Sequence, residues 1–447
     1  MKPIEYLYLD NFRGFEKALI PFRQVTFLLG ENSTGKSSVL SALNLIRNFG
    51  FWSEADFDTD NQHLGGFADL VTEGSGADIF TIGTAQYGQI YHDKSDVKFP
   101  FTVFASYVNL EGLPRLTKVT YGMEDYASQI FVEDEGIYRR NIQFNGALDE
   151  LNEQRIREIA QWHHDSTGSK AEKLGGPNVQ GITGGVLFHF SMFETERQMT
   201  EEKGEKKIRY RRDLYSLISS QRNAVWLAPV RTKPRRTYDG TKKAFSAEGD
   251  HTPYLLKKHL SSKATAQRFR NLISSLGRDS HLFEDIKIRP FGRSDSSPFE
   301  VQIKLGGLAL SISNVGYGVS QILPILAEVV TRPSNTAFHI QQPEVHLHPR
   351  AQAALGNLFY LLAQEEKKSF IIETHSDFLI DRYRQAMRSE LGNSNGQVDS
   401  SIVFFSRHKS RNIARELCFT AKGEYPDDQP KEFREFFIEE QLRVLGI

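Results

Sequence analysis

The feature that most constrains this chain is a glycine-rich loop close to its N-terminus. Residues 30–37 read G-E-N-S-T-G-K-S and match the pattern G-x-x-x-x-G-K-[ST]. The apolar run 25–29 predicts a buried strand before the loop, and apolar residues recur at helical spacing over 38–47 after it. In this context small residues direct backbone N–H groups, and the positive end of a helix dipole, toward phosphates. The loop therefore predicts an α/β fold that binds a nucleoside triphosphate; a glycine turn without a ligand is the alternative interpretation.

Length, charge and cysteine content limit the classes to which the protein can belong. With 447 residues the chain can form two or three units that each have a core. Its 55 Lys and Arg residues are matched by 56 Asp and Glu residues, so any contact with nucleic acid must come from a local patch or a partner. The single cysteine, Cys418, excludes an internal disulfide, and no apolar run approaches the roughly 18 residues of a membrane span. Because the N-terminus also lacks the apolar core of a signal peptide, we expect a cytoplasmic protein with no membrane partner.

Periodicity divides the chain into three parts. Residues 1–124 hold the loop and several short strand-like runs between 77 and 121, which predict an antiparallel sheet. Residues 125–290 are rich in charged, helix-prone segments and predict a mainly helical insertion. Residues 291–447 alternate strand and helix patterns, which predicts a sheet covered by helices.

The insertion contains three helix-prone segments, 147–162, 194–219 and 253–276. No seven-residue apolar repeat is sustained there, so a long coiled coil is not expected. The stretch 201–212 is basic on balance and includes Tyr210. This stretch is either the solvated face of a helix or a contact for a phosphate backbone or a partner nuclease.

Four segments carry polar side chains near the ends of predicted elements. They are a glycine corner that opens a helix (311–321), a strand that ends in Gln-Gln-Pro-Glu (338–344), a strand followed by a histidine (371–377) and a cationic turn with two prolines (226–238). The glycine corner predicts either a second anion-binding helix N-terminus or an ordinary strand–turn–helix corner. A carboxylate after a strand can orient an attacking water, and His375 can donate a hydrogen bond to a γ-phosphate. In the cationic turn, Arg231, Arg235 and Arg236 either contact phosphate, DNA or a partner, or hold the turn in place.

The order of these segments resembles the ATP-binding-cassette (ABC) ATPases of the SMC, RecF and OLD kind. The chain is most similar to a bacterial branch that pairs E/Q-Q-P-E-x-H-L-H-P with a V-G-x-G-x-S-Q helix and a P-x-R…P-x-R-x-Y turn. The resemblance covers residues 1–75 and 225–447 and leaves most of the insertion unmatched. It implies an α/β fold, the two-lobed ABC-ATPase (P-loop NTPase) cassette, with an antiparallel β subdomain and a helical insertion.

The resemblance also assigns residues to the binding of ATP and Mg²⁺. The loop residues that would bind the phosphates are Asn32, Ser33, Thr34, Gly35, Lys36, Ser37 and Ser38. The glycine corner would supply a signature motif that acts on the ATP of a second subunit, through Asn314, Gly316, Gly318 and Ser320. Ser37 and Gln341 are the expected Mg²⁺ partners, and His375 is the expected switch histidine.

One departure from the family pattern concerns catalysis. Related cassettes end the second-half strand in Asp-Glu-Pro, whereas this chain has Gln341-Gln342-Pro343. A glutamine can hold a Mg²⁺-bound water through its carbonyl oxygen, but it is a poor general base. Glu344 is the remaining nearby carboxylate. We therefore expect Glu344 to polarise the attacking water, with Gln342 and His375 as the other catalytic residues, and turnover to be slow.

Two histidines after this strand allow two interpretations. His346 and His348 lie on one face of an extended chain, as metal ligands can, but no further ligand follows at suitable spacing. The resemblance places both residues at a dimer contact instead. It implies a head-to-tail homodimer that closes over two ATP molecules and assembles further.

The resemblance finally implies a separate effector. OLD-type relatives often carry a fused Toprim nuclease, but the roughly 70 residues after His375 show no acidic pattern of that kind. The branch includes the ATPase subunit of Septu-type antiphage systems, which works with an HNH nuclease, and the PARIS ATPase, which works with a Toprim protein. We expect the first case: an ATPase subunit that scaffolds and regulates an HNH-type nuclease and contacts DNA through that complex. The alternatives are a free-standing RecF/SMC-like DNA-repair ATPase that binds DNA directly, and an ATP-dependent regulator with no nucleic-acid role.

Overall fold

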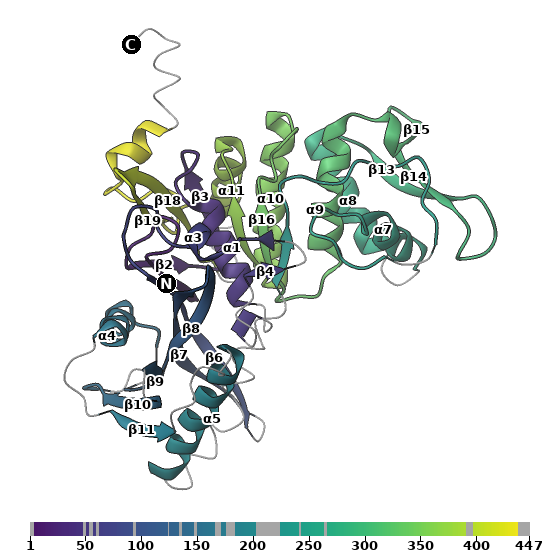
Figure 1. Ribbon diagram of the computed structural model, residues 1–447. Helices are drawn as coiled ribbons and strands as arrows, with labels where there is room; N and C mark the ends of the chain where they lie inside the picture. Colours follow the sequence, from purple (N-terminus) through teal and green to yellow (C-terminus); the bar gives the residue numbers. More distant parts are fainter. Residues whose placement is uncertain are drawn as a thin grey trace. The chain divides into compact units, whose positions relative to one another are not determined.

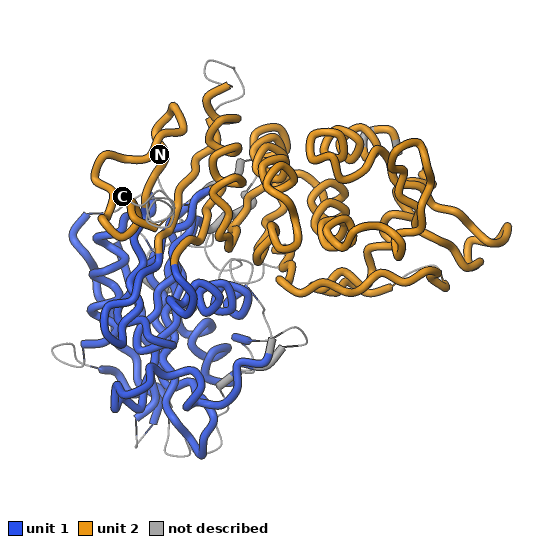
Figure 2. Tube along the Cα trace, turned by 90° about the horizontal axis from the view of Figure 1, so that it is seen from above, with its two compact units in different colours: residues 1–23, 31–223, 405–416 blue, residues 24–30, 224–404, 417–447 orange. Residues whose placement is uncertain are grey.

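Figure 1 shows the computed structural model of the protein. The structure describes residues 4–436 apart from 48–50, 53–56, 60–61, 93–94, 124, 134–135, 147–149, 166–170, 176–183, 203–223, 241–242, 263–265 and 390–396. The chain forms two compact units, coloured separately in Figure 2. The first comprises residues 1–23, 31–223 and 405–416, and the second comprises residues 24–30, 224–404 and 417–447.

The second unit is built on a largely parallel sheet. The six strands of this sheet follow the order β12 (Ala224–Leu227), β16 (Ala337–Gln341), β17 (Ser369–Glu373), β3 (Val25–Gly30), β18 (Ser400–His408) and β19 (Arg411–Cys418). Residues 405–416 of β18 and β19 are counted in the first unit. Neighbours from β12 through β3 pair in parallel. Every residue of β3 is buried, as expected for a strand covered on both faces. The carboxyl ends of the four parallel strands therefore meet at one edge, where open α/β sheets place their ligands.

The strands of this sheet share one continuous core with five helices. They are α7 (Thr252–Ser261), α8 (Ala266–Ser280), α9 (Tyr317–Thr331), α10 (Pro349–Glu366) and α11 (Asp377–Ser389). Proline at its first position starts α10, and Lys367 ends it in the left-handed conformation (φ 54°). A Cβ atom at Gly356 would lie 2.1 Å from the carbonyl oxygen of Leu379, so glycine is required where α10 meets α11. A small antiparallel sheet, β13 (Asp285–Pro290), β14 (Phe299–Leu305) and β15 (Leu308–Ser311), leads through the short 3₁₀ turn η4 (Ile312–Asn314) into α9.

The first unit contains an eight-stranded antiparallel sheet. Its order is β11 (Glu172–Gly175), β10 (Gly136–Gln143), β9 (Tyr126–Glu133), β8 (Leu113–Met123), β7 (Ser95–Leu110), β6 (Ile79–His92), β1 (Glu5–Asp10) and β2 (Ala18–Phe22). Helix α4 (Glu153–His164) packs on it, and α5 (Gly184–Glu202) packs on β8 and β9. The unit also holds α1 (Lys36–Ile46), α3 (Phe67–Leu70), β4 (Asp58–Thr59) and β5 (Gln62–His63). The predicted combination of an α/β core with an antiparallel β subdomain is confirmed.

The stretch predicted as a helical insertion differs from that interpretation in its first part. Residues 126–143 form β9 and β10, which extend the antiparallel sheet, and the helices begin only at α4. β9 carries aromatic and β-branched residues that suit a pleated surface, and the many charged residues nearby masked this preference. Segment 147–162 corresponds to α4, segment 253–276 to α7 and α8, and segment 194–219 only to the end of α5. Most of segment 194–219, and the basic stretch 201–212 after its second residue, lie outside the described residues.

None of the helices in the described ranges is both long enough and apolar enough to cross a membrane.

A buried histidine of the first unit predicts loss of stability in acid. His163 is fully buried, and its ring nitrogens lie 2.7 Å from Ser106 Oγ and 2.6 Å from Thr120 Oγ1. Burial, followed by the nearby His164 and cations, holds the His163 pKa well below its usual 6.5. Below pH 6.5 the His163 side chain therefore binds a proton in the unfolded chain but stays neutral in the folded unit. This contribution to stability is complete above pH 6.5 and falls by about 1.4 kcal/mol per pH unit below it, until the folded pKa is reached.

Unfolding midpoints measured at pH 7.5 and pH 5.5 test this prediction. A His163→Gln variant should show a smaller difference between the two pH values than the wild type. His63→Gln, at an exposed position of the same unit, should keep the wild-type difference. Equal acid sensitivity in the wild type and in His163→Gln would contradict the prediction.

Candidate nucleotide site

The glycine loop has a backbone conformation that depends on glycine. Gly35 has a φ angle of 95° and forms the N-cap of α1, and Ser33 also lies in the left-handed region at φ 62°. A Cβ atom at Gly35 would lie 2.5 Å from Phe15 Cζ and 2.8 Å from Asn412 Nδ2. Any side chain at this position would thus be both strained and blocked. The predicted strand, loop and helix are present as β3, residues 31–35 and α1.

Lys36 lies against its own loop. Its ammonium group donates a hydrogen bond to the carbonyl oxygen of Glu31 at 2.6 Å, and Thr34 Oγ1 donates to the same oxygen at 2.8 Å. The side chain of Lys36 is only 4% exposed. The first turn of α1 contains no acidic residue, so the positive end of its dipole is not neutralised locally.

The remaining loop residues are open to a ligand to different degrees. Asn32, Ser33 and Ser37 are exposed, Ser38 is half-buried, and Thr34 is buried. Exposed backbone and a hydroxyl at the start of a helix can bind an anion and a hard cation together. This arrangement is compatible with the phosphate and Mg²⁺ roles predicted for the loop, which stay predictions.

A hairpin of the first unit that is distant from the loop in sequence supports it. No local pattern of residues predicts this contact. Arg407 Nη1 donates to the carbonyl oxygen of Ser33 at 3.4 Å. Asn412 Nδ2 donates to the carbonyl oxygen of Arg13 at 3.0 Å, and the backbone N–H of Asn412 donates to Gly14 at 2.8 Å. The tip of the β18–β19 hairpin therefore fixes the turn that packs on Gly35.

At the carboxyl edge of β16 and β17, Gln341 is held by contacts at both ends of its amide. Oε1 accepts a hydrogen bond from the indole N–H of Trp226 at 3.2 Å. Nε2 donates to Glu373 Oε2 at 2.9 Å, since Gln341 and Glu373 pair directly in the two parallel strands. Gln342 follows in the left-handed region at φ 42°, and its backbone N–H donates to the carbonyl oxygen of Glu373 at 2.8 Å. This edge is thus a rigid polar platform in which one carboxylate, Glu373, comes from the strand next to β3.

Glu344 lies at the same edge and is positioned by the segment after β17. Its Oε1 accepts a hydrogen bond from the backbone N–H of His375 at 2.7 Å. Its Oε2 is buried and has no hydrogen-bond partner within the part of the chain that the structure describes. Burial raises the Glu344 pKa, although backbone hydrogen bonds, chiefly from His375, the Thr374 side chain and the charge of Arg231 oppose this shift. The structure thus brings the Glu344 carboxylate to the backbone N–H of His375, and a raised pKa makes this carboxylate a better proton acceptor near neutral pH.

The glycine corner forms a helix N-terminus at the surface of the second unit. Gly316 is the N-cap of α9, and no acidic residue occupies the first turn. Asn314 and Gly316 are exposed. Ser320, in contrast, is buried, and its hydroxyl donates back to the carbonyl oxygen of Tyr317 at 2.7 Å. Asn314 and Gly316 are therefore accessible to a second molecule, whereas the Ser320 hydroxyl is engaged within its own helix.

The start of α9 packs on the segment that carries Glu344. A Cβ atom at Gly318 would lie 2.7 Å from the carbonyl oxygen of His346, and the rings of Tyr317 and His346 meet edge to face at 4.8 Å. His348 is the N-cap of α10, where its side chain accepts from the N–H of Ala351. His346 and His348 thus have structural contacts of their own. No group of three or more His, Cys, Asp or Glu residues suited to a metal occurs among the described residues.

This close packing predicts a stability difference between two neighbouring glycines. Gly318→Ala forces a methyl group against a backbone oxygen, so we expect the free energy of unfolding to fall by about 1–3 kcal/mol. Gly316→Ala is the matched control because a Cβ atom there meets nothing within 4 Å, and it should cost less than about 1 kcal/mol. Urea unfolding of the two variants measures the difference. Equal stabilities would show that α9 can shift away from His346 at no cost.

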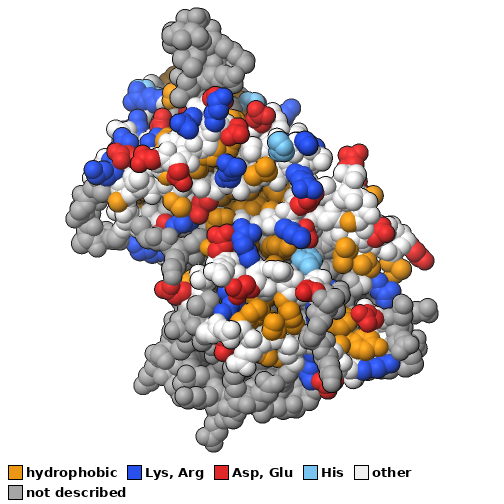
Figure 3. Space-filling view, turned by 90° about the vertical axis from the view of Figure 1, so that its left-hand side faces the viewer, with side chains coloured by type: hydrophobic (Ala, Val, Ile, Leu, Met, Phe, Trp, Pro, Cys, Tyr) orange, Lys and Arg blue, Asp and Glu red, His pale blue; other side chains and the backbone are white. Residues whose placement is uncertain are grey.

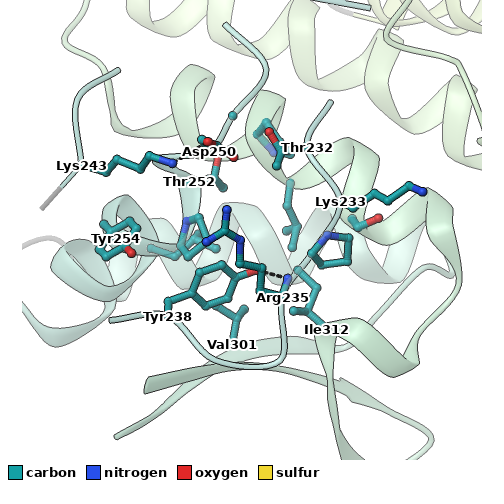
Figure 4. A pocket seen from close by; sticks show the side chains of 17 residues that line it. Thr232, Lys233, Arg235, Tyr238, Lys243, Asp250, Thr252, Tyr254, Val301 and Ile312 are labelled. Atoms are coloured by element: carbon teal, nitrogen blue, oxygen red, sulfur yellow. Dashed lines mark hydrogen bonds and ion pairs between the residues drawn. The ribbon is translucent and has the colours of Figure 1, made fainter. Parts of the chain in front are cut away.

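A cationic pocket lies on the other side of α9, and Figure 4 shows it from close by. Thr232, Lys233 and Arg235 line it together with Ser320, Leu323 and Pro324 of the helix. Lys243 donates to Asp250 at 2.5 Å and lowers the Asp250 pKa. The phenol O–H of Tyr238 accepts from the backbone N–H of Arg235 at 2.8 Å, which fixes the proline turn. The turn predicted as cationic therefore packs along α9.

Comparison with known proteins now identifies the family. Residues 25–381 match the family model described as "AAA domain, putative AbiEii toxin, Type IV TA system". The chain belongs to this family. As an AAA-domain protein with the loop and sheet described above, it is a nucleotide-binding ATPase with a P-loop NTPase fold.

Solved structures similar to this AAA-domain protein include SMC head domains. One, a head bound to the C-terminal winged-helix domain of ScpA, shares 12% identity over 94% of this chain and 98% of that chain, with a TM-score of 0.44. A Pyrococcus furiosus head bound to the C-terminal domain of ScpA shares 14% identity over 100% and 99%, with a TM-score of 0.43. The Thermotoga maritima head shares 13% identity over 93% and 99%, with a TM-score of 0.39. No curated protein matches the sequence.

Proposed function

We propose that this protein is an ATP-binding, slowly hydrolysing ATPase subunit that scaffolds and regulates a separate nuclease in bacterial antiphage defence. The observation that carries the proposal is the composition of the β16–β17 edge. Gln341 and Gln342 replace the expected carboxylates, and both ends of the Gln341 amide are engaged by Trp226 and Glu373. Such an edge can bind a nucleotide but has little capacity to activate water, so ATP acts mainly as a conformational signal.

The residues present fit Mg²⁺, a hard cation that prefers oxygen ligands and retains several waters. The exposed Ser37 hydroxyl is one proposed ligand. Gln341 Oε1 accepts one hydrogen bond, from Trp226, and keeps a lone pair for a metal-bound water. When bound, Mg²⁺ neutralises phosphate charge.

The chain's own groups provide the remaining chemistry of the proposed site. Lys36 and the loop N–H groups bind the phosphates, and His375 donates to the terminal phosphate. Glu344 accepts a proton from the attacking water at Oε2, while the His375 N–H holds Oε1 at 2.7 Å. Gln342 orients this water through its side-chain amide.

A second copy of the chain is the proposed partner at α9. The exposed Asn314 and Gly316 begin a helix whose first turn holds no acidic residue. This helix N-terminus suits the terminal phosphate of ATP bound by another subunit. We propose a head-to-tail dimer, assembled further, that closes with ATP and opens after its hydrolysis.

The defence role rests on the resemblance to the Septu-type ATPase subunit. Purification of the tagged chain together with the product of its neighbouring gene tests the role. A stoichiometric HNH nuclease is expected in the complex. Tight DNA binding by the isolated chain, with a steep salt dependence, would instead support the DNA-repair ATPase. On the face shown in Figure 3, acidic and basic side chains are interspersed among the described residues.

A further inference from the structure

Arg231 is a deeply buried arginine whose donors are only partly satisfied. It follows β12 in the second unit, and its side chain is 2% exposed. Nη2 donates to the carbonyl oxygen of Gln341 at 2.9 Å. Nε and Nη1 have no hydrogen-bond partner among the described residues. Since buried charged donors are costly to leave unpaired, an arginine of this kind indicates a role with a ligand.

The carboxylate that acts on Arg231 electrostatically is Glu344. Its Oε2 is also unpaired among the described residues, so no hydrogen bond joins the two side chains. Arg231 thus offers N–H donors, and Glu344, whose carboxylate also interacts with the Thr374 side chain, offers an acceptor at Oε2. A third group that can both accept and donate would bind to the two side chains together. A terminal phosphate with its attacking water has this combination, because phosphate oxygens accept from arginine and the water donates to a carboxylate.

The backbone of Arg231 is connected to the signature helix. Its carbonyl oxygen accepts a long hydrogen bond, 3.5 Å, from Nε2 of the buried Gln321 in α9. The next residues, Thr232 to Arg235, line the pocket against Ser320 and Leu323 of the same helix, as Figure 4 shows for the turn. The Glu344 segment reaches the start of α9 separately, through His346 and Gly318. A displacement of Arg231 would therefore be passed to α9 through packed residues.

We propose that Arg231 detects the terminal phosphate of ATP by binding it through its N–H donors that lack a partner among the described residues. The segment 231–235 then positions α9 for contact with a second copy of the chain. This inference rests on the proposed ATP-dependent dimer. It makes Arg231 a substrate-contacting residue that separates ATP from ADP, since ADP has no terminal phosphate at this edge. A protein whose dimer responds to ATP and not to ADP needs such a discrimination.

Arg231→Met, which keeps much of the volume but removes the donors, is the direct test. We expect its Kd for ADP to equal that of the wild type, while its Kd for a non-hydrolysable ATP analogue rises at least 10-fold. ATP-dependent dimerisation, measured by light scattering, should be lost. Arg231→Lys should recover part of the ATP preference because it restores a charged donor. Arg289→Met, at a side chain that is 62% exposed, is the matched control and should behave as the wild type.

A second measurement on the wild type covers the case in which Arg231→Met fails to fold. Amide hydrogen exchange in segments 231–235 and 317–323 should slow with the ATP analogue and not with ADP. Equal protection by the two nucleotides would overturn the inference. A folded Arg231→Met with normal ATP preference and dimerisation would overturn it as well, while leaving the ATP-dependent dimer intact. A wild type that does not dimerise with the ATP analogue would overturn the proposed function and this inference together.

Discussion

A Glu344→Gln variant is expected to bind ATP as the wild type does and to hydrolyse it at least about 100-fold more slowly. The substitution keeps a carbonyl oxygen that can accept from the His375 N–H, so the β16–β17 edge should keep its geometry. It removes the proton acceptor. Burial raises the pKa of this carboxyl group, and hydrogen bonds and the charge of Arg231 reduce that rise. Gln341 and Gln342 are already amides, and the nearby Glu373 carboxylate is engaged by the Gln341 amide, so neither position at the end of β16 offers a replacement.

Single-turnover hydrolysis and equilibrium ATP binding should be measured side by side for this variant. Glu435→Gln, at a side chain that is 49% exposed and pairs with Lys431, is the matched control and should hydrolyse ATP at the wild-type rate. Dimers of Glu344→Gln should persist with ATP, because the terminal phosphate is retained. A wild-type hydrolysis rate in Glu344→Gln would remove Glu344 from the mechanism.

The parts of the site that follow from sequence are those set by local patterns. The loop pattern, the apolar run before it and the helical spacing after it predicted β3, the glycine turn and α1, because these elements depend on neighbouring residues. The approach of Glu344 to His375 was also predictable. Each residue follows a buried strand, and parallel neighbours such as β16 and β17 end at the same edge.

Other features of the site depend on contacts between distant residues, which periodicity does not encode. Arg13 and Asn412 are 399 positions apart, yet their hydrogen bond fixes the turn behind Gly35. Trp226 and Gln341 lie in β12 and β16, two strands that are far apart in sequence and become neighbours only in the folded sheet. Likewise, the sequence does not reveal that only some of the Arg231 N–H donors have hydrogen-bond partners, because this depends on the residues packed around the side chain.

The segment 125–143 illustrates a different limit of sequence reasoning. Its charged residues suggested helices, but Arg139 and Arg140 of β10 lie inside polar networks of the first unit. Arg139 pairs with Glu194 at 3.2 Å, and Arg140 donates to Gln129 at 2.6 Å. A charged residue at a strand position is thus compatible with burial when partners from other elements satisfy it, which composition alone does not reveal.

A Lys36→Ala variant is expected to lose ATP affinity by at least about 100-fold, or roughly 2.7 kcal/mol. The Lys36 ammonium group lies at the N-terminus of α1 and donates at 2.6 Å to the Glu31 carbonyl, so it is held where phosphates are expected. Lys431→Ala, at a side chain that is 81% exposed, is the control, and unfolding midpoints of all variants establish that the fold is kept. Wild-type affinity in a folded Lys36→Ala protein would place the nucleotide elsewhere. Together with Glu344→Gln this variant separates binding from turnover: if ATP is the signal, Lys36→Ala should abolish the dimer, whereas Glu344→Gln should prolong it.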